Sequence, residues 1–168
     1  GKDGFLYVLG RFKSLLISSD GEKYSPEGIE EALVEKSPYI DQVMLYNNQC
    51  PTTTALIVPN RDALHRHLKE KGLKAESAEG RTAALLLIES ELARFKKGGE
   101  FQGMFPERWL PSSFAVLAEP FTEQNQMINS TMKMVRPKIE KAYKERIDYI
   151  YTSEGKQTLN QQNMDSVF

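Results

Sequence analysis

The chain has 168 residues, which suits one domain or one domain with a tail, and its 27% charged and 40% hydrophobic residues are typical of a soluble globular protein. The net charge of -1 gives no overall attraction to nucleic acid or to an anionic membrane. The single cysteine, Cys50, cannot form an internal disulfide, and no apolar run approaches the roughly 20 residues that span a bilayer. These features favour a reducing, cytoplasmic setting and argue against a nucleic-acid partner or a membrane-spanning segment.

The N-terminal segment predicts a β-hairpin. Residues 4–9 and 13–18 are two short apolar runs that flank Gly10-Arg11, which is the pattern of two strands around a bend. The opening GKDGFLY has neither a start methionine nor a signal peptide. A chain that begins on a turn and enters a strand at once is typical of a piece cut from a longer protein, although a cleaved expression tag would look similar.

A turn and a helix follow the hairpin. Residues 19–21 (Ser-Asp-Gly) signal a turn, because glycine adopts positive φ without a steric penalty. Ser25 and Pro26 predict a helix start, with the serine as N-cap and the proline at the first helical position. This helix should end near Ser37-Pro38. Ile29, Ala32 and Leu33 fall on one face of this helix.

The centre of the chain predicts a small sheet. Residues 41–47 and 53–58 are apolar on both faces, which predicts two central strands joined by a loop around Pro51. Residues 113–118 (SFAVLA) predict a further strand.

The remaining segments predict helices, a loop and a tail. A short helix carrying Leu64 and Leu68 should end at Gly72, and residues 79–97 form a longer helix, with one apolar face made by Leu85, Ile88, Leu92 and Phe95 at helical spacing. Residues 98–111 are a loop punctuated by glycine and proline, and Pro137 begins a last helix whose face carries Ile139, Tyr143 and Ile147. Residues 152–168 predict a polar, mobile tail. The sum is an α+β domain over 1–150, with an N-terminal β-hairpin and a small sheet flanked by three or four helices.

Several reactive residue types carry no clear site by themselves. His65 and His67 are two apart on a predicted helix, so they point to different faces and make a poor metal pair, and we expect no metal site. Cys50 has no base assigned by spacing, and Asn129-Ser130-Thr131 is a glycosylation sequon by chance. The chain also lacks a phosphate-binding glycine loop and a nucleophile elbow.

Two motifs nevertheless stand out. The first spans Gly10 to Glu30, and the second runs from Trp109-Leu110-Pro111 to Lys133 and Arg136, a lysine followed three residues later by arginine. Together they resemble signatures of the adenylate-forming enzymes, the superfamily of acyl-CoA synthetases, firefly luciferase and nonribosomal adenylation domains. In that family the first motif lies where the large N-terminal domain joins the small C-terminal domain. The resemblance is strongest to long-chain fatty acid–CoA ligases, although many members have glycine where this chain has Met132. It is thin over residues 72–105, because this connection is longer than in compact members.

The resemblance implies that the chain is the C-terminal domain of an acyl-CoA synthetase whose large ATP- and acyl-binding domain is absent. Such enzymes join a fatty acid to the α-phosphate of ATP, with Mg²⁺, and then transfer the acyl group to coenzyme A. ATP and Mg²⁺ would be bound mainly by the absent domain. The small domain swings between the two steps and presents a different face each time.

The resemblance also assigns roles to individual residues. Lys133 would stabilise the negative charge of the adenylation step, since lysine is a compact cation on a long stem. Arg11 would reach the nucleotide, and Lys13 would lie at the hinge between the domains. Residues 19–22 (Ser19, Asp20, Gly21 and Glu22) would border the channel for coenzyme A in the second step. Without the family, Lys13 and Lys133 are interpreted as solvated lysines, Arg11 as half of a surface salt bridge and residues 19–22 as a plain hairpin turn.

Two other functions stay open from the sequence. One is an adenylating ligase that loads a carrier protein instead of coenzyme A. The other is an interaction domain that keeps the fold and has lost the chemistry. Peripheral membrane contact also stays open, because the implied substrate is a lipid although no amphipathic anchor is evident.

Overall fold

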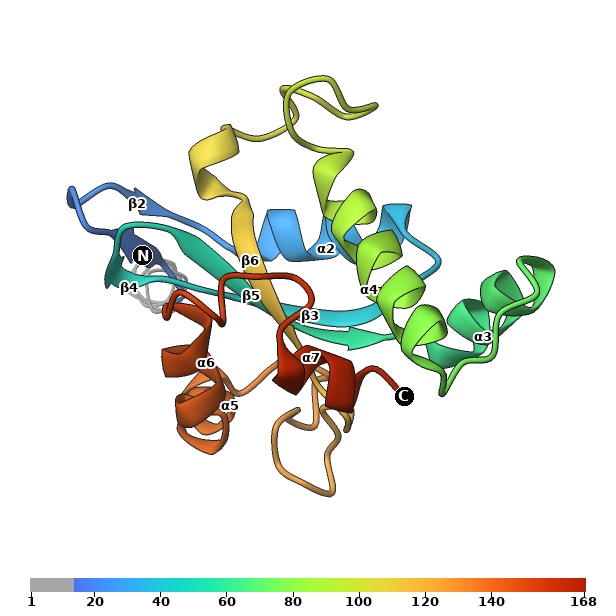
Figure 1. Cartoon of the computed structure of the whole chain (residues 1–168). Helices are drawn as coiled ribbons and strands as arrows, with labels where there is room; N and C mark the ends of the chain where they lie inside the picture. Colours follow the sequence, from blue (N-terminus) through green and yellow to red (C-terminus); the bar gives the residue numbers. More distant parts are fainter. Residues whose placement is uncertain (1–13) are drawn as a thin grey trace.

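The computed structural model describes residues 14–168, which form a small α+β domain, as predicted (Figure 1). The predicted strand at 4–9, together with Arg11 and Lys13, lies outside the described residues. Two mixed sheets have the strand orders β2-β1-β4 and β3-β5-β6. Their strands are β1 (Leu16–Ser18), β2 (Lys23–Tyr24), β3 (Ile40–Tyr46), β4 (Asn48–Cys50), β5 (Thr53–Pro59) and β6 (Pro111–Val116).

The larger sheet is centred on β5, all of whose seven residues are buried. It pairs antiparallel with β3 and parallel with β6, and the parallel pairing requires the long connection through residues 60–110. The prediction of two central strands is therefore right for β5 and wrong for β3, which is an edge strand with Asp41 exposed. The predicted loop around Pro51 is shortened by β4, which pairs with β1.

Three helices lie between β2 and β6: α2 (Glu27–Lys36), α3 (Arg61–Glu70) and α4 (Ala78–Ala93). The bounds of α2 confirm the predicted helix, but the predicted cap is wrong because the Ser25 hydroxyl donates to Glu27 Oε2 at 2.6 Å instead of capping a backbone N–H. Helix α3 is capped by Asn60, whose Oδ1 accepts from Ala63 N at 3.1 Å. Helix α4 ends at Ala93, four residues before the predicted end. A 3-10 turn, η1 (Glu107–Trp109), interrupts the predicted loop at 98–111.

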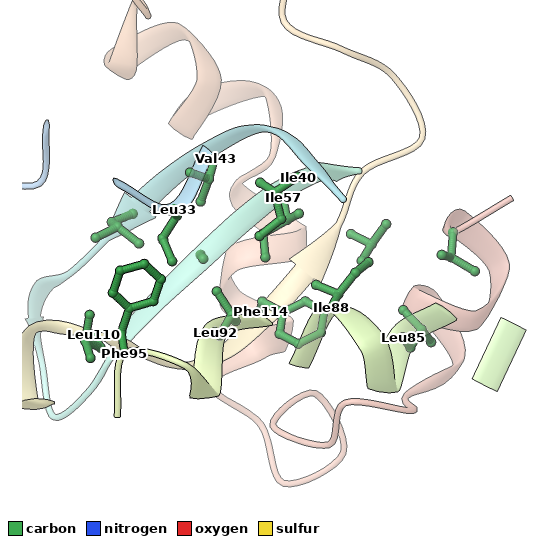
Figure 2. Close-up of a cluster of buried hydrophobic side chains, with 14 of the residues drawn as sticks. Leu33, Ile40, Val43, Ile57, Leu85, Ile88, Leu92, Phe95, Leu110 and Phe114 are labelled. Atoms are coloured by element: carbon green, nitrogen blue, oxygen red, sulfur yellow. The ribbon is translucent and has the colours of Figure 1, made fainter. Parts of the chain in front are cut away.

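The core is split by the larger sheet because successive residues of β5 point to opposite faces. Ala55 and Ile57 belong to one cluster, which is packed by α2, α3 and α4, whereas Leu56 and Val58 belong to the other. Figure 2 shows the first cluster, in which Ile88 and Leu92 of α4 and the following Phe95 face Leu33 of α2 and Ile57 of β5. The four residues predicted to form the buried face of the longer helix are buried there: Leu85, Ile88, Leu92 and Phe95.

The predicted last helix is two helices, α5 (Arg136–Ala142) and α6 (Lys144–Ile150), which cover the second face of the sheet (Figure 1). The chain breaks at Tyr143, whose φ of −112° and ψ of 22° lie outside the helical region. The predicted face is still formed, since Ile139 and Ile147 are buried. None of the helices in residues 14–168 combines the length and apolar character needed to cross a membrane.

Residues 152–168 differ from the predicted mobile tail because they pack onto the domain. They contain α7 (Gln161–Ser166), which contacts α4 and β6. The fully buried Asn163 accepts from Val116 N at 2.9 Å and donates to Phe114 O at 3.1 Å. The guanidinium of Arg61 donates to the carbonyl oxygens of Ser166 and Val167. The polar composition of this segment therefore serves internal hydrogen bonds.

Candidate functional site

Lys133 lies on the long loop between β6 and α5, which projects from the bottom of the domain in Figure 1. The loop ends in a narrow hairpin, closed by an antiparallel bridge between Ile128 and Met134. Both Lys133 and its neighbour Met132 are exposed, and Met132 is 70% exposed. No hydrogen bond or ion pair engages the ammonium group of Lys133 within residues 14–168. The site residue predicted for catalysis is therefore presented outward.

A groove of about 580 Å³ separates this hairpin from α2 and the start of β3. Met132, Lys133 and Met134 line one wall, and Val34 of α2 lines the other. Ser14, which directly follows the predicted hinge residue, also lines it. Among residues 14–168, its charged lining comprises two cations, Lys133 and Arg136, and five carboxylates: Glu27, Glu30, Glu31, Glu35 and Asp41. The groove is therefore acidic, with Lys133 at its wall as the exposed cation.

A buried ion pair joins the two sequence motifs at the floor of the groove. Arg136 donates through Nη1 to Glu30 Oε2 at 2.9 Å, and its Nη2 donates to Glu30 Oε1. The backbone N–H of Leu45 donates to the same carboxylate at 2.7 Å. Glu30 belongs to the first motif and Arg136 to the second, so a contact across 106 positions fixes the Lys133 loop against α2.

Burial dominates the electrostatics of this pair. Removal of Glu30 from water raises the pKa of its carboxyl above its usual value, and the charge and hydrogen bonds of Arg136 oppose that rise. Because Glu30 is only 5% exposed, its negative charge depends on Arg136.

The residues predicted for the coenzyme A side form the turn between β1 and β2. Gly21, at a φ of +88°, donates its N–H to Ser18 O at 3.0 Å. Asp20 accepts from the N–H of Glu22 at 3.1 Å and from the Ser18 hydroxyl, and these bonds lower the pKa of its carboxyl. The prediction of a turn at residues 19–22 is confirmed, and Gly21 supplies the positive φ that it needs.

The turn is braced from outside by Arg108. Its guanidinium donates to both oxygens of Glu22 at 2.7 Å, which lowers the pKa of the Glu22 carboxyl. Arg108 also lies over the ring of Trp109 at 5.8 Å, and Trp109 stacks on Tyr24 at 5.3 Å with an interplanar angle of 7°. The conformation of residues 19–22 is therefore tied to the segment before β6.

The two regions do not form one site. The β1–β2 turn projects at the left of Figure 1 and the Lys133 loop at the bottom, and residues 19–22 do not line the groove. Arg11 and Lys13 lie outside the described residues, so their predicted roles stay predictions.

The other candidates take structural contacts. The ring of His65 packs on Phe168 at 4.8 Å and that of His67 meets Tyr39 edge-on at 5.8 Å. Within the described residues no group of three His, Cys, Asp or Glu side chains is placed to hold a metal ion. Cys50 is half-buried, beside Asn48 O at 3.6 Å.

Two contacts that hold the predicted site residues could not be found from the sequence. Glu30 and Arg136 each lie within a quoted motif, but nothing in the spacing shows that they pair. Arg108 precedes the Trp109 of the second motif, and no local signal links it to Glu22.

Comparisons with known proteins agree with this fold. Residues 13–90 match the family model for the C-terminal domain of AMP-binding enzymes. Long chain acyl-CoA synthetase 8 of Arabidopsis thaliana is 29% identical over 156 residues, which cover 89% of this chain and 21% of the relative. A long-chain fatty acid–acyl-carrier-protein ligase of the same plant is 27% identical over 149 residues, covering 89% of this chain and 18% of the relative.

A solved structure of an adenylation domain has a similar fold. The adenylation domain of a carboxylate reductase from Mycobacterium chelonae superposes with a TM-score of 0.66 at 28% identity, covering 83% of this chain and 19% of that chain. The chain thus spans about a fifth of the length of each of these proteins.

Proposed function

The chain belongs to the AMP-binding enzymes as their C-terminal domain, and on this premise we propose that it is the small domain of a long-chain fatty acid–CoA ligase. The observation that carries the proposal is the outward Lys133 on a loop that the Glu30–Arg136 pair fixes to α2. A rigid base under a flexible, exposed cation suits a group that must reach a reaction centre outside its own domain.

Lys133 is proposed to act in the adenylation step. When bound, ATP would supply the α-phosphate that the fatty acid carboxylate attacks, which gives acyl-adenylate and releases pyrophosphate as the leaving group. Both reacting groups are anions, so a cation at the oxygens where negative charge accumulates lowers the barrier. The ammonium of Lys133 is suited to that position because it is exposed and unengaged by other side chains of residues 14–168.

The groove beside Lys133 does not fit a nucleotide by itself. In the part of the chain that the structure describes, five carboxylates line the groove against two cations, and one of these cations, Arg136, is paired with Glu30. Polyphosphate would be repelled there. ATP and Mg²⁺ therefore belong to the large domain in this proposal, and Lys133 reaches toward them. We expect the isolated chain to bind ATP weakly or not at all.

The β1–β2 turn is proposed to act in the thioester step. Its carboxylates are held by Ser18 and Arg108, so the turn offers a defined backbone surface more than free charge. Gly21 has no atom within 4 Å of the place where a side chain would begin, which leaves open space for the arm of a thiol substrate. In this proposal the domain rotates about Lys13 to exchange the two faces, and Arg11 contacts the nucleotide.

The acceptor of the acyl group is proposed to be coenzyme A. The support is that a relative is named as a long-chain acyl-CoA synthetase. A carrier protein is the second candidate, because another relative of similar identity is named as an acyl-carrier-protein ligase. We propose that the enzyme is cytoplasmic. Any contact with a membrane would be peripheral and would serve uptake of the lipid substrate.

One experiment separates these functions. The protein that carries this chain together with its large domain is incubated with ATP, Mg²⁺ and a long-chain fatty acid, with coenzyme A and a carrier protein offered together. Mass spectrometry should find the acyl group on coenzyme A. Acyl-carrier protein as the product would favour the second candidate, whereas the absence of both adenylate and thioester would favour a non-catalytic interaction domain. Calorimetry that finds micromolar ATP affinity for the isolated chain would contradict the assignment of ATP to the large domain.

A further inference from the structure

The hairpin that carries Lys133 is organised by one side chain, that of Asn129. Its Oδ1 accepts from the backbone N–H of Thr131 at 3.0 Å, from the Thr131 hydroxyl at 2.7 Å and from the backbone N–H of Lys133 at 3.0 Å. A single amide oxygen thus gathers three donors at the tip of the hairpin.

The backbone of Asn129 completes the arrangement. Its N–H donates to Lys133 O at 2.9 Å, and its carbonyl accepts from Met132 N at 2.9 Å. Both backbone polar groups of Lys133 are therefore bonded to Asn129, which fixes the point from which the exposed lysine side chain extends.

The backbone conformation of Met132, which directly precedes Lys133, depends on these hydrogen bonds of Asn129. Met132 has a φ of +64°, in the left-handed region that a residue with a side chain adopts only when its surroundings impose it. The bonds that impose it are those of Asn129 on either side, at Thr131 and Lys133. Without the amide oxygen, Met132 could return to negative φ, and the base of Lys133 would move.

We propose that Asn129 is a positioning residue for Lys133 and that its Oδ1 sets the adenylation rate without touching substrate. This inference rests on the proposed function, in which Lys133 stabilises the adenylation transition state. A displacement of the order of 1 Å at a catalytic group costs about 100-fold in rate. Because the thioester step is proposed to use the β1–β2 turn, the effect should be confined to adenylation.

The same loop offers a matched control in Asn125. Its Oδ1 accepts from the N–H of Thr122 at 3.0 Å and of Met127 at 3.1 Å, so it is also an exposed asparagine that organises a turn. Its bonds reach no further than Met127, one residue before the bridge between Ile128 and Met134 that closes the Lys133 hairpin. Loss of either asparagine removes similar hydrogen bonds, but only Asn129 contacts the lysine.

The test uses the full-length protein that contains this chain, with the variants Asn129→Ala, Asn129→Asp, Asn125→Ala and Lys133→Ala. Asp keeps an acceptor oxygen in the position of Oδ1, so it is the conservative rescue. Three readouts are compared: kcat and KM of ATP–pyrophosphate exchange with a fatty acid, thioester formation from premade acyl-adenylate, and the thermal unfolding midpoint.

Asn129→Ala should lower kcat of exchange about 10- to 100-fold, with the KM for ATP and the second half-reaction changed less than about 3-fold. Asn129→Asp should recover most of this loss, and Asn125→Ala should stay within about 3-fold of the unchanged protein. The inference is overturned if Asn129→Ala leaves exchange intact, lowers both half-reactions equally, or matches Asn125→Ala. If Lys133→Ala itself leaves exchange intact, the proposed function fails instead.

Discussion

Two Glu–Arg pairs support the two candidate faces of this domain, and they differ in burial. In the Glu30–Arg136 pair, which fixes the Lys133 loop, the side chains are 6% and 14% exposed. In the Glu22–Arg108 pair, which braces the β1–β2 turn, they are 31% and 63% exposed. Both pairs are bidentate, yet the pKa of Glu30 is raised and that of Glu22 is lowered. The same two residue types thus form a structural joint in one place and a surface brace in the other.

Burial explains the difference. In water an arginine favours the ionised carboxylate, so Glu22 loses its proton more readily beside Arg108. In the interior the cost of removing a charge from water exceeds that gain for Glu30. Loss of the buried Glu30–Arg136 pair should therefore lower the free energy of unfolding much more than loss of the exposed Glu22–Arg108 pair. Each pair nevertheless supports a proposed catalytic face.

Breaking the buried joint should have the largest effect. Glu30→Ala leaves the guanidinium of Arg136 unpaired and should lower the free energy of unfolding by about 3–5 kcal/mol. Urea denaturation of the chain measures this. Glu22→Ala is the matched control and should leave the denaturation midpoint nearly unchanged. Equal losses for the two variants would contradict the comparison.

The two carboxyl groups should titrate on opposite sides of the ordinary glutamate pKa of 4.5. A raised pKa means that folded Glu30 holds its proton more tightly than unfolded Glu30, so its contribution to stability falls as pH rises from 4.5 through the raised value. Glu22 contributes above pH 4.5 and loses this as pH falls through its lowered value. Carboxyl carbon shifts followed by NMR give both midpoints, and a Glu30 midpoint below that of Glu22 would be inconsistent with this order.

Removal of the exposed Glu22–Arg108 pair should lower thioester formation without lowering the stability of the fold. Arg108→Ala frees Glu22 and loosens the turn at residues 19–22, so thioester formation from premade acyl-adenylate should fall about 3- to 10-fold. Pyrophosphate exchange and the unfolding midpoint should be nearly unchanged. A drop in exchange equal to the drop in thioester formation would show that the two faces are not separate.

The smallest effect is expected at Met132. Glycine adopts a φ of +64° without strain but loses more entropy on folding, so Met132→Gly should change stability by less than about 1 kcal/mol and leave exchange within about 2-fold. Met132→Val is the control, because a β-branched residue at positive φ is a genuine outlier and should cost about 1–3 kcal/mol. A large loss in the glycine variant would mean that the methionine side chain itself contributes.

Features of the fold with local causes could be predicted from the sequence. Helix α2 and strand β5 follow from the spacing of apolar residues, and the turn at residues 19–22 follows from Gly21. The break at Tyr143 and the packing of residues 152–168 could not be predicted, because both depend on distant partners. For example, Asn163 reads as a polar tail residue until Phe114 and Val116 are placed beside it.

In the candidate site, too, the residues on the loops could be predicted and the distant partners that hold the loops could not. Lys133 and residues 19–22 were predicted only through the family resemblance, and their roles stay predictions. The supports of these loops were not found, since Glu30 and Arg136 are 106 positions apart and Glu22 and Arg108 are 86 apart. Asn129 appeared only as part of a chance sequon, although its neighbours show that its side chain shapes the lysine loop.

The most direct test asks whether Lys133 acts in the adenylation step alone and not in thioester formation. Lys133→Ala and its control Lys138→Ala, an exposed lysine on α5, are compared in the full-length protein. Pyrophosphate exchange should fall about 100-fold or more in the first variant alone, because one preorganised charge is lost from the adenylation step. Thioester formation from premade acyl-adenylate should survive in both. Exchange that persists in Lys133→Ala would contradict the assignment of Lys133 to adenylation and with it the two-face account of the domain.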